Sequence, residues 1–276
     1  MRPVSVNFHL YKPCNYRCRF CFATFRDVDG HLTLADAKRL LTLLREAGTE
    51  KINFAGGEPT LHPHLGELLF SARHLGFVTS LVSNGTRLLQ LLENHAANLD
   101  WVALSVDSAD EATQAALGRG GGDHVQRSIA LFDELHRHQI HVKLNTVVTR
   151  LNFNEDMSAF VRRVRPERWK IFQVLPVEGQ NDGSVEDLLI SFEQFEVFVK
   201  RHQPLSEEGF QLVVETNDLM KDSYVMINPQ GQFYNTITGR HVYSSPILEV
   251  GVETAMVQVG WNVENFLARG GIYGWK

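Results

Sequence analysis

Strand-like and helix-like stretches alternate along most of this 276-residue chain, and this alternation limits the possible folds more than any other feature. Strands are expected at Val4–Leu10, Lys51–Ala55, Phe77–Ser83, Trp101–Asp107, His141–Val148 and Arg168–Leu175. Apolar residues at helical spacing lie between them, at Leu34–Ala47, Leu65–Leu75, Leu88–Asn94, Val125–His138 and Glu155–Val164. Such an α/β alternation predicts a parallel sheet with helical crossovers, either an open sheet or a full or partial (β/α) barrel.

The polar residues of the expected strands fall on one face. Alternate residues of a strand point to opposite sides, so the first strand separates Val6 and Phe8 from Asn7. The same parity in other strands collects Asn7, Asp107, Lys143, Asn145, Arg168 and Lys170. If the apolar face packs on the helices, these side chains line a barrel interior, where unpaired charges are costly unless a polar, anionic ligand is bound. The alternative is a solvated face of an antiparallel sheet; the interleaved helices favour the barrel.

The last quarter of the chain has a different pattern. After Pro204 the periodicity becomes irregular, with short strands expected at Gln211–Glu215 and Tyr224–Asn228. We therefore expect a barrel over residues 1–205 and a C-terminal extension over 206–276 that closes the active site as part of one structural unit. A net charge of −5 offers no electrostatic argument for nucleic acid or an anionic membrane as partner.

All three cysteines, Cys14, Cys18 and Cys21, follow the first strand with the spacing C-x3-C-x2-C. Thiolates suit zinc or iron–sulfur clusters, and a cluster is usually held by four cysteines. Three cysteines would leave one iron of a four-iron cluster open to a small molecule. Zinc would need a fourth ligand from His9 or His31, and the second ligand pair typical of structural zinc sites is absent from the sequence. The small number of cysteines also indicates a reducing, cytoplasmic location.

Further motifs end the next strands. The sequence Gly56-Gly57-Glu58-Pro59 ends the second strand, Ser83 opens Ser-Asn-Gly after the third, and Ser105 lies in Ser-Val-Asp-Ser at the fourth. Each alone could be a plain turn. Together they fall at the carboxyl ends of strands, where barrel active sites form.

The basic residues of the polar face indicate a polyphosphate site. Lys143, Arg168 and Lys170 converge on one interior without matching acids, and charge-assisted bonds to phosphate are strong. Arg269, beside Gly270-Gly271, is by itself more typical of a surface charge.

The chain resembles the radical S-adenosylmethionine (SAM) enzymes in its cysteine motif, and specifically the viperin family from Val6 onward. The stretches that carry this resemblance include Cys14–Phe22, Glu50–Pro59, Val82–Gly85, Gly118–Gly120, Lys143–Asn145, Arg168–Gln173, Glu178–Asn181, Met220–Tyr224 and Arg269–Tyr273. The segment Phe233–Arg240 matches poorly.

The resemblance implies a partial (β/α)6 TIM-like barrel and roles for individual residues. Cys14, Cys18 and Cys21 would bind a [4Fe-4S] cluster; Gly56, Gly57, Glu58, Pro59, Ser83, Ser105 and Arg119 would hold SAM. Lys143, Asn145, Arg168, Lys170 and Arg269 would lie at a nucleoside triphosphate, Asn7 and Thr216 near its base, and Tyr224 near its sugar as a late donor of hydrogen or a proton.

The implied reaction is removal of the C4′ hydrogen of a ribonucleoside triphosphate and loss of the 3′-hydroxyl as water. The product, a 3′-deoxy-3′,4′-didehydro nucleotide, would terminate viral transcripts. We expect CTP as substrate, with UTP or GTP as alternatives, and a flavodoxin or ferredoxin as external electron donor. Vertebrate members begin with a membrane-docking helix, whereas this chain starts just before its first strand; we therefore expect a soluble microbial member acting against phage.

Two other hypotheses remain at the level of sequence. One is a peptide-modifying or molybdopterin-type radical SAM enzyme, which usually carries further cysteines for auxiliary clusters; none follows Cys21. The other is a non-catalytic iron–sulfur or zinc-binding module.

Overall fold

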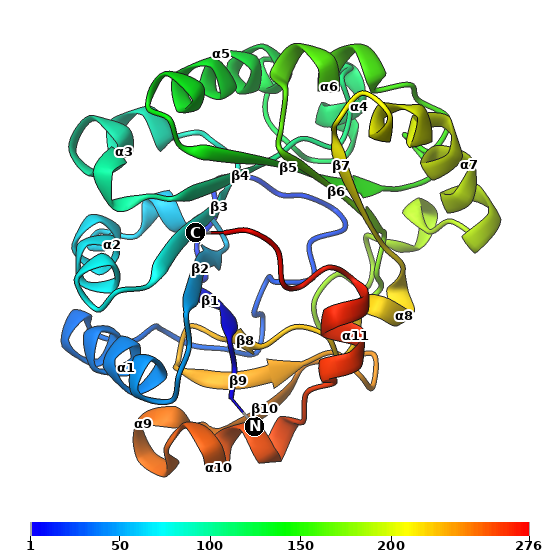
Figure 1. Cartoon of the computed structure of the whole chain (residues 1–276). Helices are drawn as coiled ribbons and strands as arrows, with labels where there is room; N and C mark the ends of the chain where they lie inside the picture. Colours follow the sequence, from blue (N-terminus) through cyan, green and yellow to red (C-terminus); the bar gives the residue numbers. More distant parts are fainter. Residues whose placement is uncertain (1, 276) are drawn as a thin grey trace.

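Ten strands form one curved sheet in the computed structural model, which describes residues 2–275. Neighbouring strands follow the order β10-β9-β8-β1-β2-β3-β4-β5-β6-β7. The strands of the parallel series are β1 (Ser5–Tyr11), β2 (Lys51–Gly56), β3 (Val78–Ser83), β4 (Trp101–Ser105), β5 (His141–Val148), β6 (Arg168–Gln173) and β7 (Gln211–Glu215). Figure 1 shows them as an incomplete ring with helices outside, which is the predicted partial barrel.

The helices of the barrel lie on the outer side of this ring (Figure 1). They are α1 (Leu34–Glu46), α2 (Leu65–His74), α3 (Leu88–His95), α4 (Glu111–Ala116), α5 (His124–Arg137), α6 (Ser158–Val164) and α7 (Phe192–His202). α1 shows how sequence produces them: Thr33 caps the helix by accepting a hydrogen bond from Asp36 N–H, and Leu40 and Leu44 are fully buried one turn apart. Gly48 follows with a positive φ of 93°, which ends the helix.

The predicted division of strand faces is confirmed. Val6, Phe8, Leu104 and Leu144 belong to the main hydrophobic core between the sheet and the helices. The opposite parity faces the interior, where Asn7 lines a cavity together with residues from the neighbouring strands.

The region after residue 205 contributes strands at both edges of the sheet. β7 pairs in parallel with β6, and β8 (Met226–Ile227) pairs in parallel with β1. β9 (Gln232–Asn235) and β10 (Val242–Pro246) continue antiparallel from β8. The remaining helices are α8 (Asn217–Met220), α9 (Ile247–Val250), α10 (Val252–Val259) and α11 (Val263–Ala268). β7 thus continues the barrel beyond the predicted boundary.

The segment after α11 runs back across the opening of the ring (Figure 1). Tyr273 reaches Lys51 of β2 and Lys143 of β5, and the indole N–H of Trp101 donates to the carbonyl of Trp275 at 3.3 Å. These contacts lie near the amino ends of the strands, so the chain terminus covers that end of the barrel. Within residues 2–275, no helix has both the length and the apolar character that a membrane crossing requires.

Candidate active site

A cavity of about 930 Å³ occupies the interior of the barrel. Its volume is at the upper end of the range of roughly 300–1,000 Å³ for ligand pockets. The predicted site residues that line it are Asn7, Cys14, Cys18, Cys21, Gly56, Gly57, Glu58, Ser83, Ser105, Arg119, Lys143, Asn145, Arg168, Lys170, Tyr224 and Arg269. The structure thus brings together in one cavity residues that lie more than 250 positions apart in the chain.

The three cysteines lie on the loop that follows β1, each partly buried. The N–H of Tyr16 approaches Cys14 Sγ at 3.4 Å, and the N–H of Cys21 donates to the carbonyl of Cys18 at 3.1 Å. Burial raises the pKa of Cys14 and Cys21, and raises that of Cys18 to about 12. The thiols therefore hold their protons in the ligand-free protein, and metal binding would release them.

The donor set fits an iron–sulfur cluster better than zinc. In residues 2–275, no three His, Cys, Asp or Glu side chains converge as one metal ion requires. A four-iron cluster has no such requirement, because each thiolate binds a different iron. Neither candidate zinc histidine is placed to help: His9 packs edge-on against Phe25 with ring centroids 5.5 Å apart, and His31 packs on Tyr11 at 5.0 Å. We therefore set the zinc hypothesis aside.

The glycines of the Gly56–Pro59 turn make room for the backbone of the chain itself. A Cβ on Gly56 would overlap the carbonyl oxygen of Tyr11, and one on Gly57 would overlap that of Lys12. The N–H of Gly57 donates to the Tyr11 carbonyl at 2.6 Å. The two glycines thus allow the β2 turn to lie directly on the segment that leads into Cys14.

The carboxylate of Glu58 ties two strand ends together. It accepts hydrogen bonds from the Ser83 hydroxyl and the Asn84 N–H, both at 2.7 Å, and from Thr60. Burial raises the pKa of Glu58, and these donors oppose the increase. Pro59 is buried at the start of a 3-10 turn and does not line the cavity. Glu58 and Ser83 therefore stabilise the loops after β2 and β3.

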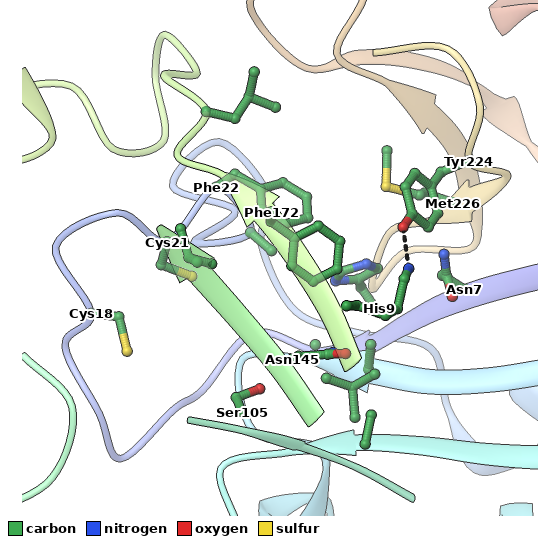
Figure 2. A pocket seen from close by; sticks show the side chains of 18 of the residues that line it. Asn7, His9, Cys18, Cys21, Phe22, Ser105, Asn145, Phe172, Tyr224 and Met226 are labelled. Carbon is green, nitrogen blue, oxygen red and sulfur yellow. Dashed lines mark hydrogen bonds between the residues drawn. The ribbon is translucent and has the colours of Figure 1, made fainter. Parts of the chain in front are cut away.

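Arg119 reaches the cavity as half of a buried ion pair. Its Nε donates to Asp107 at 2.5 Å, and both side chains are almost fully buried. Asp107 also accepts from the N–H of Val147 at 2.9 Å, which fixes its orientation. Ser105, two positions before Asp107, also lines the cavity, and its side chain is labelled in Figure 2.

A group of cations lines the opposite part of the cavity: Lys51, Lys143, Arg168, Lys170 and Arg269. Lys51 and Lys143 both donate to the hydroxyl of Tyr273, and the Arg168 guanidinium stacks 3.8 Å from the centre of that ring. Burial lowers the pKa of Lys51 to about 7 and that of Lys170 to about 8. Arg269, which alone resembles a surface charge in the sequence, has a side chain only 8% exposed.

Tyr224 lies between Lys170 and Glu215. Lys170 Nζ donates to the Tyr224 hydroxyl at 2.5 Å, as the dashed line in Figure 2 shows, and that hydroxyl donates to Glu215 at 2.5 Å. The Arg269 guanidinium covers the Tyr224 ring at 3.6 Å. Burial and the Glu215 carboxylate raise the pKa of Tyr224 well above its ordinary value, so the phenol is neutral.

Thr216 does not line the cavity. Its hydroxyl caps α8 by accepting from the N–H of Leu219 at 3.4 Å, so the structure places this predicted base contact in a helix cap. Glu215, the residue before Thr216, does reach the site, because it forms an ion pair with Lys170. Sequence analysis also missed Lys51 and Tyr273. Lys51 was detectable, because it shares the polar parity of β2 with Asn53; the role of Tyr273 depends on how the terminus folds back.

Comparison with known proteins identifies the superfamily and the fold. Residues 10–164 match the model of the radical SAM superfamily. Among solved structures, the chain is similar to native anSMEcpe with bound AdoMet (TM-score 0.70, 14% identity, covering 97% of this chain and 83% of that one). It is also similar to Streptococcus suis SuiB bound to S-adenosylmethionine (TM-score 0.67, 17% identity, 84% and 60%). At this identity the likeness concerns the fold, which is that of a radical SAM enzyme.

Sequence relatives define the family more narrowly. The chain is 45% identical to an S-adenosylmethionine-dependent nucleotide dehydratase of Flammeovirga pacifica, over 99% of this chain and 96% of the relative. It is 41% identical to one of Lacinutrix mariniflava (99% and 59%) and 36% identical to one of a Thermoplasmatales archaeon (98% and 96%). The chain belongs to the viperin family of SAM-dependent nucleotide dehydratases, and is therefore an enzyme. Radical SAM enzymes in general use SAM and a [4Fe-4S] cluster.

Proposed function

We propose that this enzyme dehydrates a ribonucleoside triphosphate, CTP in the first place, to its 3′-deoxy-3′,4′-didehydro analogue, and that the product acts as a chain terminator of viral transcription. The observation that carries the substrate class is the set of buried cations in the same cavity as the three cysteines. Glu215 pairs with Lys170 and Arg269, and a triphosphate would supply further negative charge to the group. The names of the relatives support a nucleotide substrate.

The cofactor end of the cavity is assigned to Cys14, Cys18 and Cys21, which would bind the cluster. Bound there, the cluster and SAM would supply the one-electron chemistry that the proposed removal of the C4′ hydrogen requires. Gly56, Gly57, Glu58 and Pro59 with Ser83 would shape the loops that hold SAM; Ser105 and Arg119 would contact it from the other side of the cavity. The Arg119–Asp107 ion pair as a whole has no net charge, and its guanidinium N–H groups would be the donors to SAM.

The substrate end is assigned to the cations. Lys143, Arg168, Lys170 and Arg269, with Lys51, would bind the triphosphate and thereby fix the distance of the sugar from the cofactor. Asn145 lies between the two ends (Figure 2). Tyr224 would face the sugar as a neutral phenol that can give up hydrogen or a proton.

Asn7 is the group proposed to contact the base. Its Oδ1 accepts a hydrogen bond from Asn53 Nδ2 at 2.8 Å, so the Asn7 amide N–H groups are the ones free to donate. A donor of this kind matches N3 of cytosine, an acceptor that is replaced by an N–H donor in uracil, and through this contact Asn7 would favour CTP over UTP. We propose no base contact for Thr216.

The experiment is anaerobic reconstitution with iron, sulfide, reductant and SAM, followed by incubation with the four ribonucleoside triphosphates in competition. Mass spectrometry should find loss of water from CTP first, with nucleotide-stimulated 5′-deoxyadenosine. Preferred turnover of UTP, GTP or ATP would overturn the base assignment. Absence of nucleotide-stimulated 5′-deoxyadenosine would overturn the proposed reaction. We expect a small flavin or iron–sulfur protein as electron donor and a cytoplasmic location.

A further inference from the structure

A group of histidine and tyrosine rings lies behind the β1 wall of the cavity. This histidine–tyrosine cluster consists of His9, Tyr234, His241 and Tyr243. Ring centroids are 5.7 Å apart for His9 and Tyr234, and 4.7 Å apart for Tyr234 and His241. Tyr234 lies within the segment 233–240, which matches the family poorly, and His241 and Tyr243 follow directly.

The outer end of the cluster is connected to solvent. The Tyr243 hydroxyl donates to Asp27 Oδ1 at 3.1 Å, and Asp27 is an exposed residue. Because that hydroxyl proton is already given to Asp27, the Nδ1 of His241, 3.0 Å from the same oxygen, is the donor in their hydrogen bond. Burial lowers the pKa of His241 to about 4, so its imidazole is neutral at neutral pH.

The inner end contains polar atoms without partners. His241 Nε2, His9 Nδ1 and the Tyr234 hydroxyl are each fully buried and make no hydrogen bond to the described residues. Buried polar groups are rarely left in this state, and a buried water bonds to two to four of them. Three such groups on rings that contact one another meet the requirement for one water.

His9 connects this end to the substrate cavity. It lines the cavity itself, and Figure 2 shows it beside Asn7 on the side where Tyr224 lies. Both imidazoles also pack on Phe25, whose ring centroid lies 5.5 Å from that of His9 and 5.5 Å from that of His241. Burial lowers the pKa of His9 to about 3. His9 is thus also neutral, and a neutral imidazole can take a proton on one nitrogen and release one from the other.

We propose that Asp27, Tyr243, His241, one buried water and His9 form a path that conducts protons from solvent to the substrate during dehydration. This inference rests on the proposed function. After hydrogen removal, the C4′-centred substrate radical gains one electron from the external flavin or iron–sulfur donor. The C3′–O bond breaks, the C3′=C4′ double bond forms, and the leaving hydroxide takes one proton to become water.

The path would supply that proton. Tyr224 could give its own proton first, but its hydroxyl is bonded to Glu215, which has no exposed surface. The phenol would then need a proton from elsewhere before the next turnover. Whether the proton from His9 reaches the leaving hydroxyl directly or restores Tyr224, one proton per turnover enters through Asp27.

The test compares Tyr243→Phe with Tyr11→Phe. Tyr243→Phe keeps the ring and removes the hydroxyl that joins His241 to Asp27. Tyr11 is a matched control, because its ring also packs edge-on against two histidines, His31 and His62, and its side chain does not line the cavity. Reconstituted enzyme is supplied with SAM, reductant and the nucleotide it turns over, and 5′-deoxyadenosine and dehydrated nucleotide are both measured.

The ratio of dehydrated nucleotide to 5′-deoxyadenosine should fall about tenfold in Tyr243→Phe, less than the 10²–10⁴-fold of a lost acid catalyst because cavity water can substitute. Asp27→Asn, at an exposed position, should lower it in the same direction, and Tyr11→Phe should leave it unchanged. An unchanged ratio in Tyr243→Phe and Asp27→Asn, an equal fall of both products, or a lower ratio in Tyr11→Phe would overturn the path. Failure of the proposed function is distinct: the wild type would then form no nucleotide-stimulated 5′-deoxyadenosine.

A second measurement does not need the loaded enzyme. ¹⁵N shifts of His241 in the cofactor-free protein at pH 7 should report an Nδ1–H tautomer in the wild type, and Tyr243→Phe should lose this preference. A wild-type His241 with its proton on Nε2, or doubly protonated, contradicts the path.

Discussion

The Nζ of Lys170 lies 2.7 Å from the Oε1 of Glu215, a carboxylate at the end of β7 with no exposed surface. Arg269 lies 3.8 Å from the same oxygen. Burial raises the pKa of Glu215, but Lys170 and Arg269 outweigh burial and hold it below its ordinary value. One negative charge thus faces several cations, which leaves positive charge for a phosphate chain.

Glu215→Gln should destabilise the ligand-free protein by ~3 kcal/mol, because removing one partner of a buried ion pair leaves the other charged and unpaired. A bound triphosphate would replace the lost negative charge. The increase in melting temperature caused by the substrate nucleotide should therefore be larger in Glu215→Gln than in the wild type. Thermal unfolding with and without nucleotide measures both effects. Glu167→Gln, at an exposed carboxylate paired with His141, is the control and should change neither value. A smaller nucleotide effect in Glu215→Gln would contradict the electrostatic role.

Nucleotide binding should weaken as pH rises above neutrality. The pKa of Lys51 is lowered to about 7, so this lysine is largely neutral at about pH 8.5, and triphosphate binding must then bring a proton with it. Linkage of one proton permits up to about tenfold weaker binding per pH unit. The KM for nucleotide should rise between about pH 6.5 and 8.5, and the rise should be shallower in Lys51→Met. Lys38→Met, at a lysine on α1 whose side chain is 42% exposed, should follow the wild type. An equal slope in Lys51→Met would show that other groups cause it.

The same lysine should affect the stability of the ligand-free protein. Its pKa in the folded state lies below the unfolded value of about 10.4, so between these values the unfolded chain binds more protons and stability rises with pH. Below about pH 7 the full cost of burying the charged form is present. Lys51→Met should therefore unfold at a higher temperature than the wild type at pH 7, with the difference shrinking toward pH 10. Melting curves across this range test the direction, and a lower melting temperature of the variant at pH 7 would contradict it.

The sequence predicted the barrel because every early element repeats a local pattern. The strand at His141–Val148 has the predicted bounds, and the helix starting at Leu34 begins where Thr33 can cap it. The polar parity also placed Lys143 and Asn145 in the cavity, since the direction of a strand side chain follows from position alone. α7 was missed although Ser191 and Gln194 form a capping box, a signal that was present in the sequence.

Local sequence patterns could not predict the contacts between residues that lie far apart in the chain. Tyr273 meets Lys51 from 222 positions away, and Glu215 pairs with Lys170 only because β7 adds to the sheet edge. A threonine can bind a ligand or cap a helix, and the sequence alone does not distinguish these two roles. The hydroxyl of Thr216 caps a helix. The expected order of cofactor and substrate along the cavity comes from the resemblance to the family. No sequence pattern of the lining residues indicates this order.

Gly57→Ala should impair assembly of the cluster while leaving the barrel folded. A Cβ at Gly57 overlaps the carbonyl oxygen of Lys12, so the added methyl group must push the β2 turn away from the segment that carries Cys14. The iron content after anaerobic reconstitution should fall to less than half of the wild-type value, with an unchanged far-ultraviolet circular dichroism spectrum. Gly121→Ala is the matched control, because nothing lies within 4 Å of a Cβ there, and it should reconstitute fully. Full iron content and normal SAM binding in Gly57→Ala would mean that the turn can retreat without moving the cysteine loop, and that the close approach of the two backbones does not position the cluster.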